Sequence, residues 1–235
     1  MIVRFVGTGT CIDTSRAQSC IMIESGETRI LVDIGAGALS KLERFDVDAV
    51  LITHNHLDHN ADLLPLLKAR WLIGYEPLKI YGPIGTKAYL ESLLEAYPYL
   101  RRKVEFEIHE EERFEVKTFR VKAIPTRHSV VSRAYVIETE GKRVVISGDT
   151  APMRELMEIE CDLLVHEMSL PEGRSDSHTT PESFAEVLPF CKAKRIYITH
   201  MYPQTRKVAR EIIDRLREVK DIEFVIAEDS MVVEI

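Results

Sequence analysis

Short runs of β-branched and other apolar residues, separated by glycine, serine and charged positions, fill the first fifty residues. Such runs predict strands at 2–6, 20–24 and 29–34. A brief helix over about 38–44 is expected after Gly35-Ala36-Gly37. The continuous apolar run at 49–53 predicts a strand that is buried on both faces.

Apolar residues recur at helical spacing farther along the chain and predict further helices. They occupy 63–73, the stripe Leu90, Leu93, Leu94 and Tyr97, the face Phe184, Val187, Leu188 and Cys191, and the face Val208, Ile212, Leu216 and Val219. Pro189 is expected to kink or end the third of these helices early. Strands are predicted at 104–108, 114–123, 134–138, 143–146, 163–165 and 195–198.

Each half of the chain therefore mixes strands with amphipathic helices, and no low-complexity linker or short-period repeat divides it. This organisation predicts an α/β fold in which two sheets are sandwiched between helical layers. We expect residues 1–235 to form a single domain.

Composition changes the picture in three ways. With 45% hydrophobic and 29% charged residues, the chain has ample material for a core. The formal net charge of -7 argues against a basic protein that coats nucleic acid, although it leaves room for a local basic cleft. Its 4 cysteines form no CxxC pair, and no signal peptide or long apolar span stands out, so we expect reduced thiols, a cytoplasmic location and no membrane association.

The densest chemical signal is the segment Thr53-His54-Asn55-His56-Leu57-Asp58-His59, which directly follows the predicted buried strand. Buried cores rarely accept three unpaired histidines, and solvated loops rarely need them. Imidazole nitrogens together with a carboxylate suit zinc, and iron or manganese are alternatives. The segment therefore predicts a metal site.

Further candidate ligands stand where other predicted strands end. They are His128, Asp149 and His200. Side chains at the carboxyl ends of strands in open α/β sheets project into one cleft. Together with the four residues of the first motif they give seven candidates, which is the number that two metals sharing one bridging carboxylate require.

These motifs resemble those of the metallo-β-lactamase-fold superfamily, whose HxHxDH hallmark appears as His54, His56, Asp58 and His59. The resemblance implies a four-layer αββα sandwich of two mixed β-sheets flanked by helices. It also implies two Zn²⁺ ions, with Mn²⁺ or Fe²⁺ as alternatives. By the same resemblance His54, His56 and His128 hold one ion, Asp58, His59 and His200 hold the other, and Asp149 bridges them.

Two other regions are similar to ribonuclease Z, the endonuclease that trims precursor tRNA 3′ ends. The opening Gly7-Thr8-Gly9-Thr10 is one, and the segments around Glu167 and His178 resemble that family's HEAT and HST motifs. The resemblance implies that hydroxide on the metals attacks phosphorus, with Asp58 orienting the nucleophile. His178, oriented by Glu167, then protonates the leaving alkoxide. Asp58, His178 and Glu167 are therefore the predicted catalytic residues.

Two departures from ribonuclease Z concern the substrate. That family carries a long arm that grips tRNA between the motifs matched by His128 and Asp149, but only twenty residues separate them here. The loop Asp33-Ile34-Gly35-Ala36-Gly37 also lacks the family's glutamate. We therefore expect no tRNA-binding arm.

The sequence favours a metal-dependent hydrolase that cleaves phosphodiesters, either RNA 3′ ends or a small cyclic phosphate. The alternative is a glyoxalase II-like thioester or lactone hydrolase, which shares the seven ligands but not the elements around Glu167 and His178. A redox di-iron protein would have glutamate in place of His56, and a non-catalytic module would have lost a ligand. Resemblance to ribonuclease Z further implies a homodimer.

Overall fold

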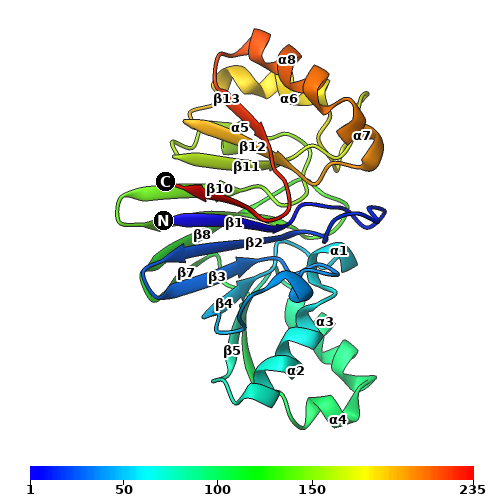
Figure 1. Cartoon of the computed structure of the whole chain (residues 1–235), viewed down its shortest axis with the longest axis vertical. Helices are drawn as coiled ribbons and strands as arrows, with labels where there is room; N and C mark the ends of the chain where they lie inside the picture. The colour runs from blue at the N-terminus through cyan, green and yellow to red at the C-terminus, as the bar shows by residue number, and fades with distance from the viewer.

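Two seven-stranded sheets pack face to face in the computed structural model, which describes all 235 residues, and helices cover both outer faces (Figure 1). The predicted four-layer α/β architecture is confirmed. Side chains of both sheets interdigitate in a central apolar layer that includes Phe5, Ile23, Phe119 and Tyr135. Alternate residues of each strand point into this layer because successive side chains of a strand face opposite sides.

The first sheet has the order β14-β1-β2-β3-β4-β5-β6. Its strands are β1 (Ile2–Gly7), β2 (Cys20–Ser25), β3 (Thr28–Val32), β4 (Ala49–Leu51), β5 (Leu78–Tyr81), β6 (Phe106–His109) and β14 (Met231–Glu234). Strands β3 to β6 run parallel, whereas β14, β1, β2 and β3 alternate in direction. The chain ends meet at this sheet, where Met1 and Ile235 exchange two hydrogen bonds.

The second sheet has the order β13-β12-β11-β10-β9-β8-β7. Its strands are β7 (Arg113–Val116), β8 (Phe119–Pro125), β9 (Arg133–Thr139), β10 (Lys142–Ile146), β11 (Leu163–Glu167), β12 (Arg195–Thr199) and β13 (Glu223–Ile226). Strands β10 to β13 are parallel, and β7 to β10 are antiparallel. Because β8 and β10 both oppose β9, their carboxyl ends lie at the same edge.

Helices of the amino-terminal half cover the first sheet, and helices of the carboxyl-terminal half cover the second. The first group is η1 (Leu39–Lys41), α1 (Leu57–Asn60), α2 (Leu63–Ile73), α3 (Thr86–Glu95) and α4 (Pro98–Arg101). The second group is α5 (Arg154–Met157), α6 (Pro181–Val187), η2 (Leu188–Phe190), α7 (Pro203–Lys207) and α8 (Ala209–Val219). None of these helices has the length and apolar character that crossing a membrane requires.

Several predicted elements differ from the observed ones. The helix expected at 38–44 is a single 3₁₀ turn, because the backbone becomes extended at Leu42 and Asp62 accepts a hydrogen bond from the Leu39 amide. The strand expected at 114–123 is a hairpin of β7 and β8, with Lys117 at a φ of 49° in its turn. Strands β5, β13 and β14 were not predicted. Helix α6 does end just before Pro189, at Val187.

Candidate functional site

Strand ends of both sheets meet at one cleft, and this brings together the residues selected from the sequence. The HxHxDH segment begins three residues beyond β4 and continues into α1. His128 follows β8, Asp149 follows β10, and His200 directly follows β12. The carboxyl ends of β8, β10, β11 and β12 share one edge, so the topology itself positions these side chains.

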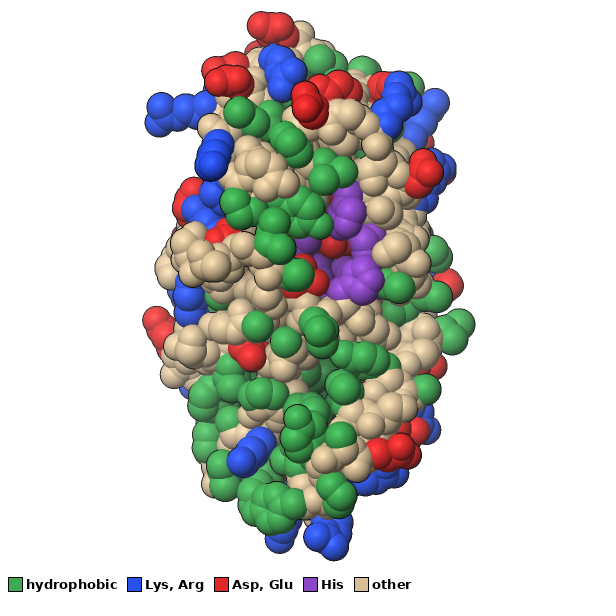
Figure 2. Space-filling view, turned by 90° about the vertical axis from the view of Figure 1, so that its right-hand side faces the viewer, with side chains coloured by type: hydrophobic (Ala, Val, Ile, Leu, Met, Phe, Trp, Pro, Cys, Tyr) green, Lys and Arg blue, Asp and Glu red, His purple; other side chains and the backbone are tan.

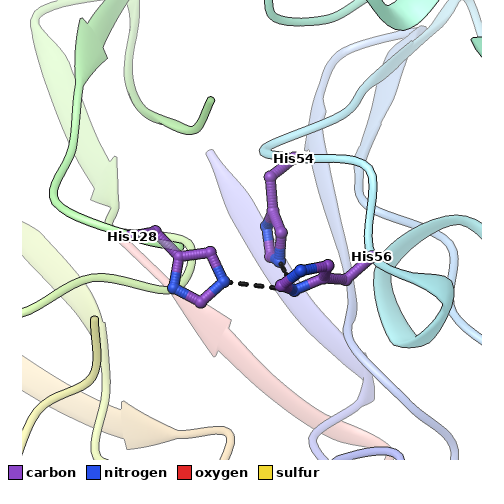
Figure 3. Close-up of side chains that lie close together, drawn as sticks. All are labelled: His54, His56 and His128. Atoms are coloured by element: carbon purple, nitrogen blue, oxygen red, sulfur yellow. Dashed lines mark hydrogen bonds between the residues drawn. The ribbon is translucent and has the colours of Figure 1, made fainter. Parts of the chain in front are cut away.

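Three histidines form the first candidate ligand group (Figure 3). The Nδ1 atom of His56 lies 3.0 Å from Nε2 of His54 and 3.1 Å from Nε2 of His128. His128 is held in place because its Nδ1 donates to the Ser177 carbonyl, at 2.7 Å. That hydrogen bond leaves the Nε2 lone pair of His128 free and aimed at the other two rings.

The second candidate ligand group consists of Asp58, His59 and His200. The two Nε2 atoms of His59 and His200 are 3.2 Å apart, and Nε2 of His200 lies 3.3 Å from Oδ2 of Asp58. Asp58 also accepts a hydrogen bond from the Cys11 amide, at 3.2 Å. Burial alone would raise the pKa of Asp58, but the hydrogen bond from His200 and the charge of His59 lower it to about 2. Asp58 therefore stays ionised.

Asp149 lies between the two groups. Its Oδ1 is 3.3 Å from Nε2 of His59, and its Oδ2 is 3.9 Å from Nε2 of His54. The carboxyl group is buried, and Oδ1 has no hydrogen-bond partner. A buried carboxylate oxygen without a donor is costly, whereas a cation placed there would satisfy it.

The protonation states also fit a metal centre. Burial, followed by the charge of His59, lowers the pKa of His54, and burial likewise lowers the pKa values of His56 and His128. These rings are neutral near pH 7, as metal-binding imidazoles must be. His59 differs: burial opposes its protonation, but Asp149 and Asp33 raise its pKa well above the usual value, so a metal ion would have to displace its proton. The residues present thus match the donor set of two divalent ions such as zinc.

Glu167 and His178 form a hydrogen-bonded pair at the border of this cluster. The Nδ1 atom of His178 lies 2.9 Å from Oε1 of Glu167 and 3.8 Å from Oδ2 of Asp149. Glu167 is fixed by hydrogen bonds from the Thr150 amide and from the amide and hydroxyl of Ser169. Burial opposes protonation of His178, but its hydrogen bond to Glu167 raises the pKa of the imidazole above its usual value. This favours the protonated, proton-donating form.

Three residues near the site have roles that sequence reasoning missed. Asp33 contacts His59, and Ser169 contacts both Glu167 and His200. The ring of Tyr202 lies 6.2 Å from that of His178, centroid to centroid. Asp33 lies just past an apolar strand, as Asp149 does, but the glycines at 35 and 37 are typical of a loop.

Basic side chains that could contact a phosphate are mostly engaged elsewhere. Arg16 pairs with Glu228, and Arg174 pairs with Glu186. Arg133 is buried and donates to the carbonyls of residues 110 and 111. The basic run 101–103 lies at α4, at the far end of the molecule from α6 and α8. Arg127, beside His128, is exposed.

The site is open to solvent on one face of the molecule. Figure 2 shows the purple histidines in a hollow, with red carboxylate atoms between them. Green apolar side chains lie beside the hollow, whereas the blue lysines and arginines of this face lie toward its ends and edges.

Comparison with known proteins gives one family match. A family model described as the beta-lactamase superfamily domain matches residues 28–201. Ribonuclease Z of Mycolicibacterium gilvum is 30% identical, and the alignment covers 93% of each chain. That alignment spans 269 positions, more than the 235 residues present here, so the relative carries insertions that this chain lacks.

Solved structures agree with the observed fold. The crystal structure of the short form of human tRNase Z superimposes with a TM-score of 0.80 at 25% identity and covers 100% of this chain and 99% of that one. The metallo-beta-lactamase fold protein YhfI from Bacillus subtilis has a TM-score of 0.85 at 24% identity, with 99% coverage of both chains.

Proposed function

This chain belongs to the beta-lactamase superfamily, and we propose that it is a metal-dependent hydrolase that cleaves phosphodiester bonds with two zinc ions bound. His54, His56 and His128 would hold one ion, and Asp58, His59 and His200 the other. Asp149 would contact both. When bound, the two ions supply a nucleophilic hydroxide near neutral pH and neutralise charge on the phosphate oxygens.

The Glu167–His178 pair is the observation that carries the choice of a phosphodiester. An alkoxide is a poor leaving group unless it is protonated as it departs, whereas a thiolate leaves readily without a proton. His178 is oriented by Glu167 at 2.9 Å and stands beside the ligand cluster. A proton donor at this position supports phosphodiester cleavage over the thioester alternative.

The other candidate catalytic residue, Asp58, is suited to orienting the attacking nucleophile. Its lowered pKa makes it a weak base, but its Oδ2 faces the cleft next to His200. We propose that Asp58 holds metal and orients the attacking nucleophile, while proton transfer to the leaving group is the task of His178.

The test combines metal analysis with a substrate panel. The purified chain is loaded with zinc, its metal content is measured, and it is offered a 3′-extended tRNA precursor, bis-p-nitrophenyl phosphate, 2′,3′-cyclic nucleotides and a thioester. We expect two zinc ions per chain and turnover of at least one phosphodiester. Thioester turnover alone would overturn the proposal in favour of the glyoxalase II-like alternative.

A matched pair of histidine variants tests the metal site separately. His54→Ala removes a buried candidate ligand, whereas His109→Ala removes a partly exposed histidine that contacts Glu107 on strand β6. We expect zinc content and activity to fall in the first variant and to stay at the wild-type level in the second.

A further inference from the structure

Exposed aliphatic side chains lie on segments that carry or adjoin the histidine cluster. They are Ile12, Leu57, Ile84, Val130 and Val131, with exposed fractions of 56%, 68%, 75%, 41% and 64%. Large apolar side chains gathered on an exposed surface indicate a binding site more often than chance exposure. We call these five residues the aliphatic rim.

Two members of the rim lie next to the second ligand group. Leu57 is the residue directly before Asp58 in α1. Ile12 belongs to the turn in which the Asp13 amide donates to the Thr10 carbonyl, and the neighbouring Cys11 amide donates to Asp58. Each of the two residues is therefore the sequence neighbour of a residue in this hydrogen bond.

The other three members border the first ligand group. Val130 and Val131 lie in the loop that leaves His128, and the base of this loop is fixed because the Arg133 amide donates to the Thr53 carbonyl, one residue before His54. Ile84 belongs to the loop that precedes Thr86, whose hydroxyl accepts from the side chain of Asn55. The five residues thus come from four segments that carry or contact candidate ligands.

Cations are scarce at this cleft by comparison. Arg16 and Arg133 are occupied by other partners, which leaves Arg127 as the exposed arginine beside a candidate ligand. An RNA-binding surface would need several free lysines or arginines for the backbone and aromatic rings for the bases. Arg127 and the aliphatic rim suit a single phosphate group attached to an uncharged body.

From this arrangement we propose that the substrate is a small phosphodiester whose non-leaving group is uncharged and aliphatic, and that the rim binds this group. The inference rests on the proposed phosphodiesterase activity. The phosphodiester would lie at the histidine cluster. Leu57, next to Asp58 of the second ligand group, and Val131, in the loop after His128 of the first, would cover the aliphatic part. RNA is then a poor substrate.

The first test compares alkyl p-nitrophenyl phosphates with methyl, butyl and hexyl groups, which share one leaving group and one reaction. Because each buried methylene contributes to binding, we expect kcat/KM to rise by about tenfold or more from methyl to hexyl. Equal values along the series would overturn the inference but leave the proposed activity intact. So would faster cleavage of a 3′-extended tRNA with a steep loss of rate between 50 and 200 mM salt.

Substitutions test whether the rim causes the dependence of kcat/KM on alkyl chain length. Val131→Thr and Leu57→Asn keep side-chain size and remove apolar character, whereas Val219→Thr and Val232→Thr do the same at exposed positions on α8 and β14. We expect the hexyl-to-methyl ratio of kcat/KM to fall at least twofold in the rim variants. The ratio should not change in the two control variants. A ratio that falls equally in all four would contradict the assignment.

Calorimetry supplies a readout that does not depend on turnover. Hexylphosphonate should bind the zinc-loaded protein at least tenfold more tightly than methylphosphonate, with a more negative heat-capacity change. Equal affinities would overturn the inference. Failure of every ester to react, together with preferential hexylphosphonate binding, would instead reject the proposed phosphodiesterase and retain the aliphatic site.

Discussion

The carboxylate of Asp33 holds the imidazole of His59 through a contact of 2.7 Å between Oδ2 and Nδ1. The same carboxylate accepts hydrogen bonds from the amide and hydroxyl of Thr53, each at 2.8 Å. It thereby joins the end of β3 to the start of the HxHxDH segment and turns Nε2 of His59 toward His200 and Asp149. A residue outside the seven predicted ligands thus sets the orientation of one of them.

Asp33→Asn is expected to weaken zinc binding by about 10–100-fold, because carboxylates behind a ligating histidine orient the ring and raise its basicity. Asparagine tolerates the φ of 60° found at this position, so the backbone change should be small. Competition with a chromogenic chelator measures the affinity.

Asp62→Asn serves as the matched control. Asp62 accepts a hydrogen bond from the backbone amide of Leu39, which is not a candidate ligand. We expect this variant to bind zinc with wild-type affinity. An equal loss of affinity in both variants would mean that Asp33 acts through general stability.

His178→Ala is expected to lower kcat by about 10²–10⁴-fold on esters with an alkoxide leaving group, since positioned proton transfer contributes that much. Zinc content should stay unchanged, because His178 is not one of the proposed ligands. On p-nitrophenyl esters the loss should be much smaller, since p-nitrophenolate departs without a proton.

The comparison of leaving groups distinguishes proton donation by His178 from a purely structural role of this residue. If both ester types lose activity to the same extent, or if zinc is lost in parallel, His178 stabilises the site instead of donating a proton. Glu167→Gln should show the same dependence on leaving group in weaker form, because glutamine still contacts the imidazole without its charge.

Gly148→Ala is expected to lower the thermal unfolding midpoint and the zinc content together. Gly148 has a φ of 58°, and an added Cβ would lie 2.8 Å from Cβ of Thr53, next to His54. Gly141→Ala shares the positive φ, at 74°, but its Cβ would meet nothing within 4 Å. We expect the free energy of unfolding, measured in urea, to fall by about 1–2 kcal/mol in the control because of backbone strain. In Gly148→Ala it should fall by several kcal/mol, because the clash adds to the strain. Similar losses would show that strain alone accounts for both.

The sequence was sufficient to select residues that the fold brings together because its signals are local. His54, His56, Asp58 and His59 share one short segment, and His128, Asp149 and His200 each lie just beyond an apolar strand. The parallel arrangement of β10, β11 and β12 then brings separate strand ends together. Contacts such as that between Ser169 and Glu167 depend on the turn after β11, which has no distinctive composition.

Parts of the fold escaped prediction for related reasons. The turn between β7 and β8 has no glycine or proline, and Lys117 adopts its positive φ because pairing of the hairpin requires it. Strand β5 is too short for a clear alternation and is defined by pairing with β4 and β6. Strand β14 depends on its pairing with β1, at the opposite end of the chain.

The last prediction concerns Asp229, which joins the carboxyl-terminal turn to the amino-terminal loop. Its carboxylate accepts hydrogen bonds from the amide and hydroxyl of Thr8, at 2.9 and 2.6 Å, and from the Ala17 amide, at 2.9 Å, and it pairs with Lys41. Burial alone would raise the pKa of Asp229, but Lys41 and these hydrogen bonds lower it.

A carboxylate with a lowered pKa in the folded state stabilises the fold above its unfolded pKa, about 3.9, and loses this contribution as the pH falls toward the folded value. Asp229→Asn should therefore reduce the free energy of unfolding by about 1–3 kcal/mol at pH 7, and the difference from wild type should shrink below about pH 4. Urea unfolding at pH 7, 5 and 3 measures it. Asp221→Asn, at an exposed position, should match wild type at every pH. A deficit in Asp229→Asn that is the same at all three values would show that the charge of Asp229 does not provide the stabilisation.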